Sequence, residues 1–353
     1  MLSRMTTECK PITIHYRKFK RATTVSKTLE QLVRSAMNHK LPGNIRVKDR
    51  YLDRLHSVNT DNFFINTYVD GAGETPLVFG DILHFTKGHL QALCHTSDTN
   101  AASVEVRQMR APAQNEYVHS QMFWMIKSDH VFVVQSMSLR TAEFELYLDW
   151  LLKDKTKQLS PDYEIILDSR FDETAIGGNL NDIQEIIVGS VVARPSTIPD
   201  KATNEQLSEV MQRKQIDAGR KIERSTAWAI LEQLLGSEAR VSSLMDAVPL
   251  EADLNVQVHI GYQTKKRKIS RLALRQLETG LRNLPDSQLQ VKAKGTNVAA
   301  DGTIRLHHNA SIRLIKTQDG DSQIISTLLD PYDVLRATVE AYSSFIANGK
   351  IKG

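Results

Sequence analysis

Lysine and arginine are the side chains whose type and spacing in this sequence most clearly indicate a chemical task. The chain of 353 residues carries a formal net charge of only +4. Residues 10–54, the first basic island, hold twelve basic and three acidic side chains, and residues 263–294, the second basic island, hold nine and two. The other residues therefore sum to a charge of −12. Two basic islands in an otherwise acidic chain favour an anionic polymer or surface as the partner.

The second basic island joins a run of four cations to a helical pattern. Residues 265–268 are Lys-Lys-Arg-Lys, and apolar residues then recur at helical spacing as far as Leu284. Like charges three or four residues apart cost a helix roughly 0.2–0.5 kcal/mol per pair, so their gathering is favourable only beside an anion. Duplex DNA supplies one phosphate charge per about 1.7 Å of axis.

A strand with charge on one face follows that helix, because residues 289–294 alternate apolar side chains with Gln290, Lys292 and Lys294. A helix and strand of this kind would contact phosphates without reading bases, and the alternative is a solvated basic face. The contacts predicted in this island are Lys265, Lys266, Arg267, Lys268, Arg271, Arg275, Lys292 and Lys294.

The first basic island supplies a secondary set of contacts just after an expected strand. Two aromatic residues, Tyr16 and Phe19, are interleaved with these cations. Such aromatics either stack on exposed bases or bury one face while the cations stay in water. The sequence carries no helix-turn-helix, zinc-finger or RRM signature, which argues against strong base specificity. The secondary contacts predicted here are Arg17, Lys18, Lys20 and Arg21.

Candidate catalytic groups are few, and each has a simpler structural explanation. His307 and His308 are adjacent, so on a strand they point to opposite faces and make a poor joint metal site. Asp168, Asp172 and Glu173 lie near a Gly-Gly pair and would suit either a Mg²⁺-dependent nuclease or an acidic loop. Phosphate-binding and nucleophile-elbow motifs are missing from the sequence. We therefore expect no catalytic residue, no metal and no cofactor.

Three functions remain open on these residues. The leading hypothesis is a non-catalytic, sequence-nonspecific DNA-binding protein. The second is a metal-dependent nuclease, and the third is a protein-interaction module that recognises an acidic partner. Two cysteines without a motif, no signal-like start and no apolar run near 20 residues predict a cytoplasmic protein.

The elements that would position these residues are strands and helices in mixed order. Helices are expected from Leu29 with Ser26 as its N-cap, over 141–153, over 204–248, up to Leu284, and at the C-terminus after Asp330-Pro331. Strands are expected near 12–19, 61–69, 76–85, 103–109, 122–126, 130–137, 163–168, 182–192, 254–260, 289–293, 304–315 and 323–329.

This order predicts an α+β fold of two domains, each a mostly antiparallel sheet with packed helices. We place the N-terminal domain at 1–159 and the C-terminal domain at 160–353. The second domain would carry a helical insertion at about 200–250.

The order of segments resembles that of the RexA family of temperate-phage exclusion proteins. The segments that carry the resemblance are 16–21, the helix with Leu29 and Leu32, 122–126, the turn at Ser128-Asp129, the helix with Leu148 and Leu151, 254–260, 265–268, 289–294 and the C-terminal helix. The helical stretch 204–248 is an addition to that pattern. The resemblance implies a two-domain homodimer that binds DNA with little sequence preference and blocks other phages together with a membrane-protein partner.

Overall fold

The computed structural model describes residues 9–71, 76–94, 106–136, 138–172, 183–192, 240, 254–261, 271–283, 289–293, 296–298, 305–319 and 322–352. These residues divide into two compact units. The first unit contains Met1–Asp172, Gln276–Asn283 and Arg305–Gly353, and the second contains Glu173–Arg275 and Leu284–Ile304. Across the described part of the chain, every helix is too short or too polar to cross a membrane.

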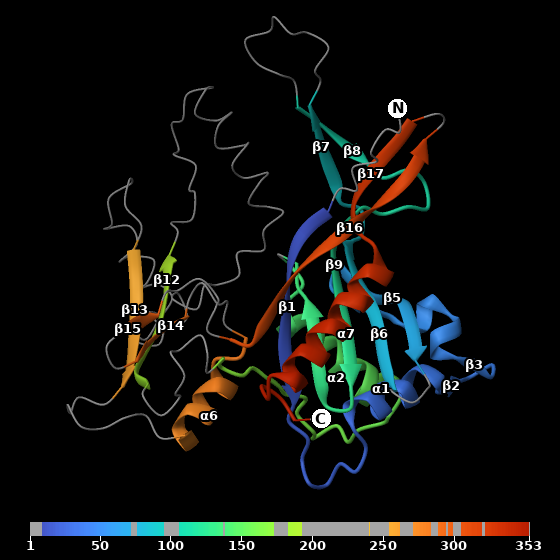
Figure 1. Ribbon diagram of the computed structural model, residues 1–353. Helices are drawn as coiled ribbons and strands as arrows, with labels where there is room; N and C mark the ends of the chain where they lie inside the picture. The colour runs from blue at the N-terminus through green and yellow to red at the C-terminus, as the bar shows by residue number, and fades with distance from the viewer. Residues whose placement is uncertain are drawn as a thin grey trace, which may run out of the picture. The chain divides into compact units, whose positions relative to one another are not determined.

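The first unit is built on a nine-stranded antiparallel sheet in the order β17-β16-β1-β10-β9-β6-β5-β4, with β11 paired to β1 at one end (Figure 1). Its strands are β1 (Cys9–Phe19), β4 (Leu55–Val58), β5 (Asp61–Gly71), β6 (Leu77–Thr86), β9 (Val118–Lys127), β10 (His130–Val134), β11 (Leu167–Asp168), β16 (His307–Asp319) and β17 (Ser322–Leu329). Strand β1 is central, because it pairs with β10 along one edge and with β16 along the other.

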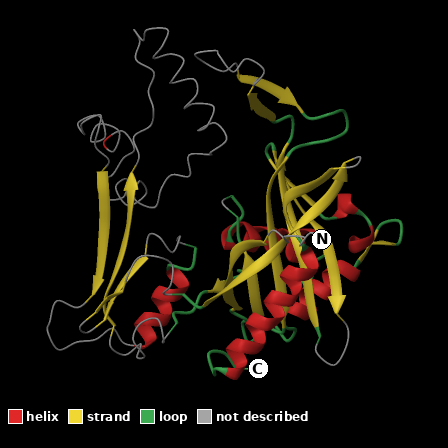
Figure 2. Ribbon diagram, turned by 45° about the horizontal axis from the view of Figure 1, so that its top comes forward, coloured by secondary structure: helices red, strands yellow, loops and turns green. Residues whose placement is uncertain are grey.

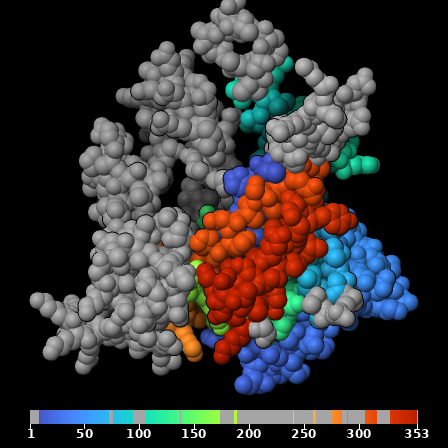
Figure 3. Space-filling model, viewed as in Figure 1, coloured from blue at the N-terminus to red at the C-terminus, as the bar shows by residue number. Residues whose placement is uncertain are grey.

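Helices cover both faces of this sheet (Figure 2). Helices α1 (Leu29–Asn38) and α2 (Thr141–Asp149) bury one face, and α2 runs on into the π-helical segment η3 (Trp150–Lys155). Helix α7 (Pro331–Ala347) buries the other face. In Figure 3, α7 and β16, in red and orange, cover the side of the first unit that faces the viewer.

Burial on both faces explains the continuous apolar runs of the central strands. In β9, Trp124 packs into the core under α1 and α2, whereas its neighbours Phe123 and Met125 pack into the core under α7. Successive side chains of a strand point to opposite faces, so a strand covered on both sides needs apolar residues at every position.

Helix α7 begins where the sequence predicts. The Asp330 side chain accepts hydrogen bonds from the backbone of Tyr332 and Asp333, and Pro331 occupies the first helical position. The prediction of Ser26 as the cap of α1 is wrong, because Thr28 caps that helix. Thr28 and Gln31 form a reciprocal capping box, which satisfies two backbone donors at the start of the helix.

Smaller elements complete the first unit. A short hairpin of β2 (Lys40–Leu41) and β3 (Ile45–Arg46) is followed by the turns η1 (Val47–Asp49) and η2 (Tyr51–Asp53). Strands β7 (Leu90–Cys94) and β8 (Val106–Arg110) form a separate two-stranded sheet.

The second unit contains a four-stranded antiparallel sheet in the order β13-β12-β14-β15. Its strands are β12 (Ile183–Val192), β13 (Leu254–Gly261), β14 (Leu289–Ala293) and β15 (Thr296–Val298). The described residues of helix α6 (Arg271–Gly280) fall in both units, since residues from Gln276 onward belong to the first.

The chain therefore has the predicted α+β fold, with a large antiparallel sheet and packed helices. The division into units differs from the boundary predicted between residues 159 and 160. Residues 305–353 belong to the first unit, because β16 pairs with β1 over seven registered positions from Cys9 to His15. The helix predicted over 204–248 lies outside the described residues except for Arg240.

Candidate nucleic-acid interface

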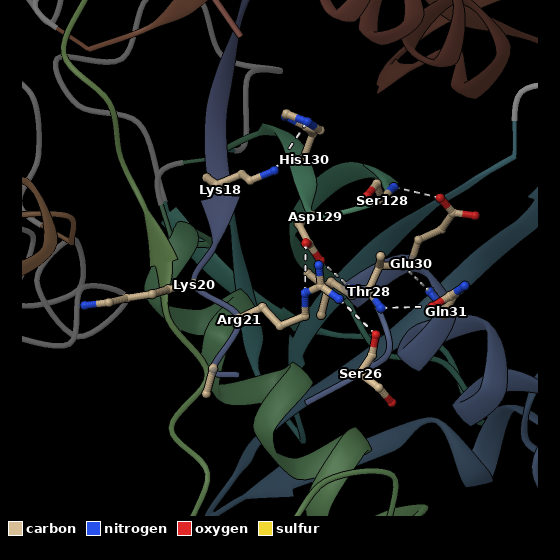
Figure 4. A network of polar contacts seen from close by, with 12 residues as sticks. Lys18, Lys20, Arg21, Ser26, Thr28, Glu30, Gln31, Ser128, Asp129 and His130 are labelled. Carbon is tan, nitrogen blue, oxygen red and sulfur yellow. Dashed lines mark hydrogen bonds and ion pairs between the residues drawn. The ribbon is translucent and has the colours of Figure 1, made fainter. Parts of the chain in front are cut away.

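The cations of the first basic island lie where β1 leaves the sheet, beside the turn between β9 and β10. Figure 4 shows the end of β1 next to Ser128 and Asp129 of that turn and to the first residues of α1. The backbone N–H of Phe19 donates to the carbonyl of Asp129 at 2.9 Å, and that of Glu30 donates to the carbonyl of Ser128 at 3.0 Å. The end of β1 and the start of α1 thus meet a turn that lies about a hundred residues later in the sequence.

Arg21 holds this junction together. Its guanidinium forms an ion pair with Asp129, with Nε 3.2 Å from Oδ2, and Nη1 donates to the carbonyl of Ser26 at 2.9 Å. The other carboxylate oxygen of Asp129 accepts from the backbone N–H of Leu29 at 3.0 Å, at the start of α1. Lys20, in contrast, is exposed and points away from this network (Figure 4).

Arg17 does not lie on the surface, so we correct the expectation that it contacts phosphate. Only 3% of the residue is exposed, and its Nη1 donates to the carbonyl of Tyr16 at 2.9 Å. Tyr16 and Phe19 are also buried, on opposite faces of β1. Burial of both rings removes the alternative in which they stack on exposed bases.

Lys18 lies against a buried histidine. Its Nζ is 3.4 Å from Nε2 of His130, and Nδ1 of His130 is 2.8 Å from the hydroxyl of Tyr16 (Figure 4 shows the first contact). Burial lowers the pKa of Lys18, and the charges of Arg170 and Arg21 lower it further, against the opposing effect of Asp129. Burial, followed by the charges of Lys18 and Arg170, lowers the pKa of His130 to about 4.

Two further cations, Lys127 and Arg170, come from other segments of the chain. Lys127 is the residue opposite His130 in the pairing of β9 with β10, and its Nζ lies 4.9 Å from the ring centre of Tyr342 on α7. The Tyr342 ring in turn lies 5.8 Å from the ring of His130. Arg170 is exposed just after β11, and its charge lowers the pKa of both Lys18 and His130. We call Lys18, Lys127 and Arg170 the His130 cluster.

The carboxylates near this cluster are largely engaged elsewhere. Asp129 is buried and binds Arg21 and the start of α1. Asp172 forms an ion pair with Lys350, with the two atoms 2.7 Å apart. Asp168 is the residue opposite Lys18 in the pairing of β1 with β11, but the carboxylate whose charge raises the pKa of Lys18 is Asp129. The pKa of Lys18 is nevertheless lowered, first because the residue is partly buried and then by the charges of Arg170 and Arg21.

The structure leaves most of the second basic island untested. Lys265, Lys266, Arg267, Lys268 and Lys294 lie outside the described residues. The backbones of Arg271 in α6 and Lys292 in β14 are described, but their side chains are not. Arg275 is exposed on α6. The role of this island in binding phosphates remains a prediction.

The catalytic candidates are dispersed within the described part of the chain. Nδ1 of His307 lies 2.8 Å from the carbonyl of Arg305, whereas the ring of His308 faces Phe345 on α7. Among the described residues, no three histidine, cysteine or carboxylate side chains are grouped so that they could hold a metal ion. Glu173 lies outside the described residues.

Sequence reasoning missed Lys127, Arg170 and His130 as members of one site. The position of Lys127 could have been predicted, because it lies at the start of the expected hairpin turn. In a tight turn, that position is opposite His130. Arg170 follows a strand of only two residues and gave no pattern. The chain matches no known protein-family model, and no curated protein is significantly similar to it.

Proposed function

We propose that this protein binds duplex DNA through its phosphates, with little preference for base sequence. The observation that carries the proposal is the position of Lys18 at 3.4 Å from the neutral His130, with Lys127 opposite His130 in the β9–β10 pairing and the charge of Arg170 acting on both. Burial is the main reason that the pKa of Lys18 is lowered, and the charge of Arg170 lowers it further. A bound phosphate would stabilise the charged form of Lys18, and buried groups with perturbed pKa values favour a functional site.

Phosphate contacts fix a protein on the duplex but carry no sequence information. The second basic island would add contacts of the same kind. By its resemblance to the RexA family, we further propose that the protein is cytoplasmic and acts as a homodimer. Its role would lie in a bacterial or prophage system that excludes phages, together with a membrane-protein partner.

The test is a salt titration of binding to a random 30-base-pair duplex, followed by fluorescence anisotropy. The variant Lys18→Met, Lys127→Met, Arg170→Gln removes three charges and keeps most of the side-chain volume. Each lost phosphate contact should reduce the slope of log affinity against log salt by about 0.9. The matched control Lys40→Met, Lys48→Met, Lys157→Gln removes three cations of the first unit outside the cluster and should bind like the parent.

Equal affinity and slope for parent and cluster variant would remove the basis of the proposal. Absence of binding by the parent would favour an acidic protein partner instead. Cleavage of plasmid in Mg²⁺ would favour the nuclease hypothesis.

A further inference from the structure

Strands β7 and β8 form an arm that projects from the first unit beyond the end of its main sheet (Figure 1). The two strands pair only with each other, in the register Leu90↔Arg110 to Cys94↔Val106. Within the described residues, the outer edge of each strand is therefore unpaired. A two-stranded ribbon by itself is at best marginally stable in water. This suggests that the arm is stabilised by binding to a partner.

The side chains of the arm are unusually exposed for their type. All five residues of β8 are exposed, and the exposed fractions of Leu93, Val106 and Met109 are 43%, 43% and 49%. Exposed apolar side chains grouped on one element mark an interaction surface. Both faces of the ribbon carry exposed apolar side chains, since Val106 and Met109 are three positions apart and point to opposite sides.

The charge of the arm indicates the chemistry of that partner. The strands carry two arginines, Arg107 and Arg110, and no acidic residue. These two residues are also three positions apart, so they too lie on opposite faces, about 10 Å apart along the strand. A flat partner would meet only one of them. A groove with an anionic wall on each side would meet both.

We infer that the β7–β8 arm enters the major groove of duplex DNA, an inference that rests on the proposed function. The major groove is about 12 Å wide and admits a two-stranded ribbon, whereas the minor groove is about 6 Å wide. Arg107 and Arg110 then reach the phosphates of the two walls. Leu93 and Met109 lie on the same face as Arg107, since Leu93 is paired with Arg107 and Met109 is two positions further along β8, so they pack against the same wall of the groove.

The first variant is Arg107→Gln, Arg110→Gln, which removes both charges and leaves the strands intact. The second replaces residues 91–109 by Asn-Gly. Leu90 and Arg110 are directly opposed, so a two-residue turn closes the shortened hairpin without moving the main sheet. The control is Lys40→Gln, Lys48→Gln, which removes two cations outside the arm.

We expect both arm variants to bind random duplex about tenfold more weakly than the parent. The double-arginine variant should lose about two units of salt slope, and the shortened variant, which keeps Arg110, about one. Their binding to single-stranded DNA should equal that of the parent. A duplex with a bulky substituent on the 5-position of every cytosine blocks the major groove, and it should reduce the affinity of the parent to that of the arm variants. The minor-groove ligand netropsin should leave parent binding unchanged.

The inference is overturned if the arm variants bind duplex like the parent while the His130-cluster variant does not, and the proposed function then stands. It is also overturned if netropsin displaces the parent protein from duplex DNA. A third contrary result would be that arm removal lowers the sedimentation mass and spares DNA binding, because the arm would then bind a second copy of the chain. If the parent binds no DNA at all, the proposed function fails first.

Discussion

Nζ of Lys18 lies 3.4 Å from Nε2 of His130, and the two residues come from strands that are 112 positions apart in the sequence. A protonated lysine donates and cannot accept, so this contact requires an unprotonated Nε2. Protonation of His130 would place two positive charges at that distance. The pair is therefore stable only while His130 is neutral, and this links the fold to pH.

Acidification from pH 6.5 toward pH 4 should destabilise the protein, because His130 is neutral in the folded state. The pKa of His130 is about 4 in the folded protein and about 6.5 when unfolded, so the unfolded chain binds more protons between those values. The stability due to neutral His130 is present above pH 6.5 and is lost as the pH falls toward 4. By pH 5 the loss is on the order of 2 kcal/mol.

Urea unfolding at pH 7 and pH 5 measures this loss, and His130→Gln should show a smaller difference than the parent. His15, whose pKa is lowered to about 3 mainly by burial, accounts for acid sensitivity that remains in the variant. An unchanged difference in His130→Gln would contradict the assignment to His130.

The Asp129 carboxylate should stabilise the junction between β1, the β9–β10 turn and α1. Replacing Asp129 by Ala leaves the backbone N–H of Leu29 and the guanidinium of Arg21 without their acceptor. We expect a loss of roughly 1–3 kcal/mol in the free energy of unfolding. The exposed pair Arg46–Asp49 provides the control, because Asp49→Ala should cost less than about 1 kcal/mol. Similar losses for the two variants would show that Asp129 is not a structural anchor.

Replacement of Gly80 by a larger residue should destabilise the fold, because Trp124 packs directly on the backbone of Gly80. A Cβ atom at position 80 would lie 2.5 Å from the carbonyl oxygen of Thr67 and 2.6 Å from Cζ2 of Trp124. Gly80→Ala should therefore destabilise the protein by roughly 1–3 kcal/mol and alter the near-UV circular dichroism of the tryptophan. Gly280→Ala is the control, since nothing lies within 4 Å of the added atom. Parent-like unfolding of Gly80→Ala would contradict this packing.

The second basic island should contribute to DNA binding independently of the His130 cluster. Replacing Lys266, Arg267 and Arg271 with Ala should weaken binding about equally for different duplex sequences and reduce the salt slope by about 2–3. Combination with the cluster variant should add the two slope changes. A gel-shift affinity equal to that of the parent would exclude these three residues from the interface.

The sequence predicted most of the local elements of the fold. The apolar run 122–126, the turn after it and the run from His130 gave the β9–β10 hairpin, and Asp330-Pro331 gave the start of α7. These predictions succeed because turn, cap and strand preferences act over a few residues. The cap of α1 was misplaced by two positions because Ser26 and Thr28 are both good caps, and only Thr28 has a glutamine three residues later to complete the box.

The amino-acid sequence by itself determined the two basic islands, the α+β class and the elements that carry the cations. Only the tertiary structure decided that Arg17 is buried, that Arg21 is an anchor, and that Lys18 lies beside His130. It also decided that the C-terminal strands and helix join the first unit through β16 and β1. The physical reason is that charge and periodicity are properties of a segment, whereas burial and ion pairing depend on which distant strands lie next to one another.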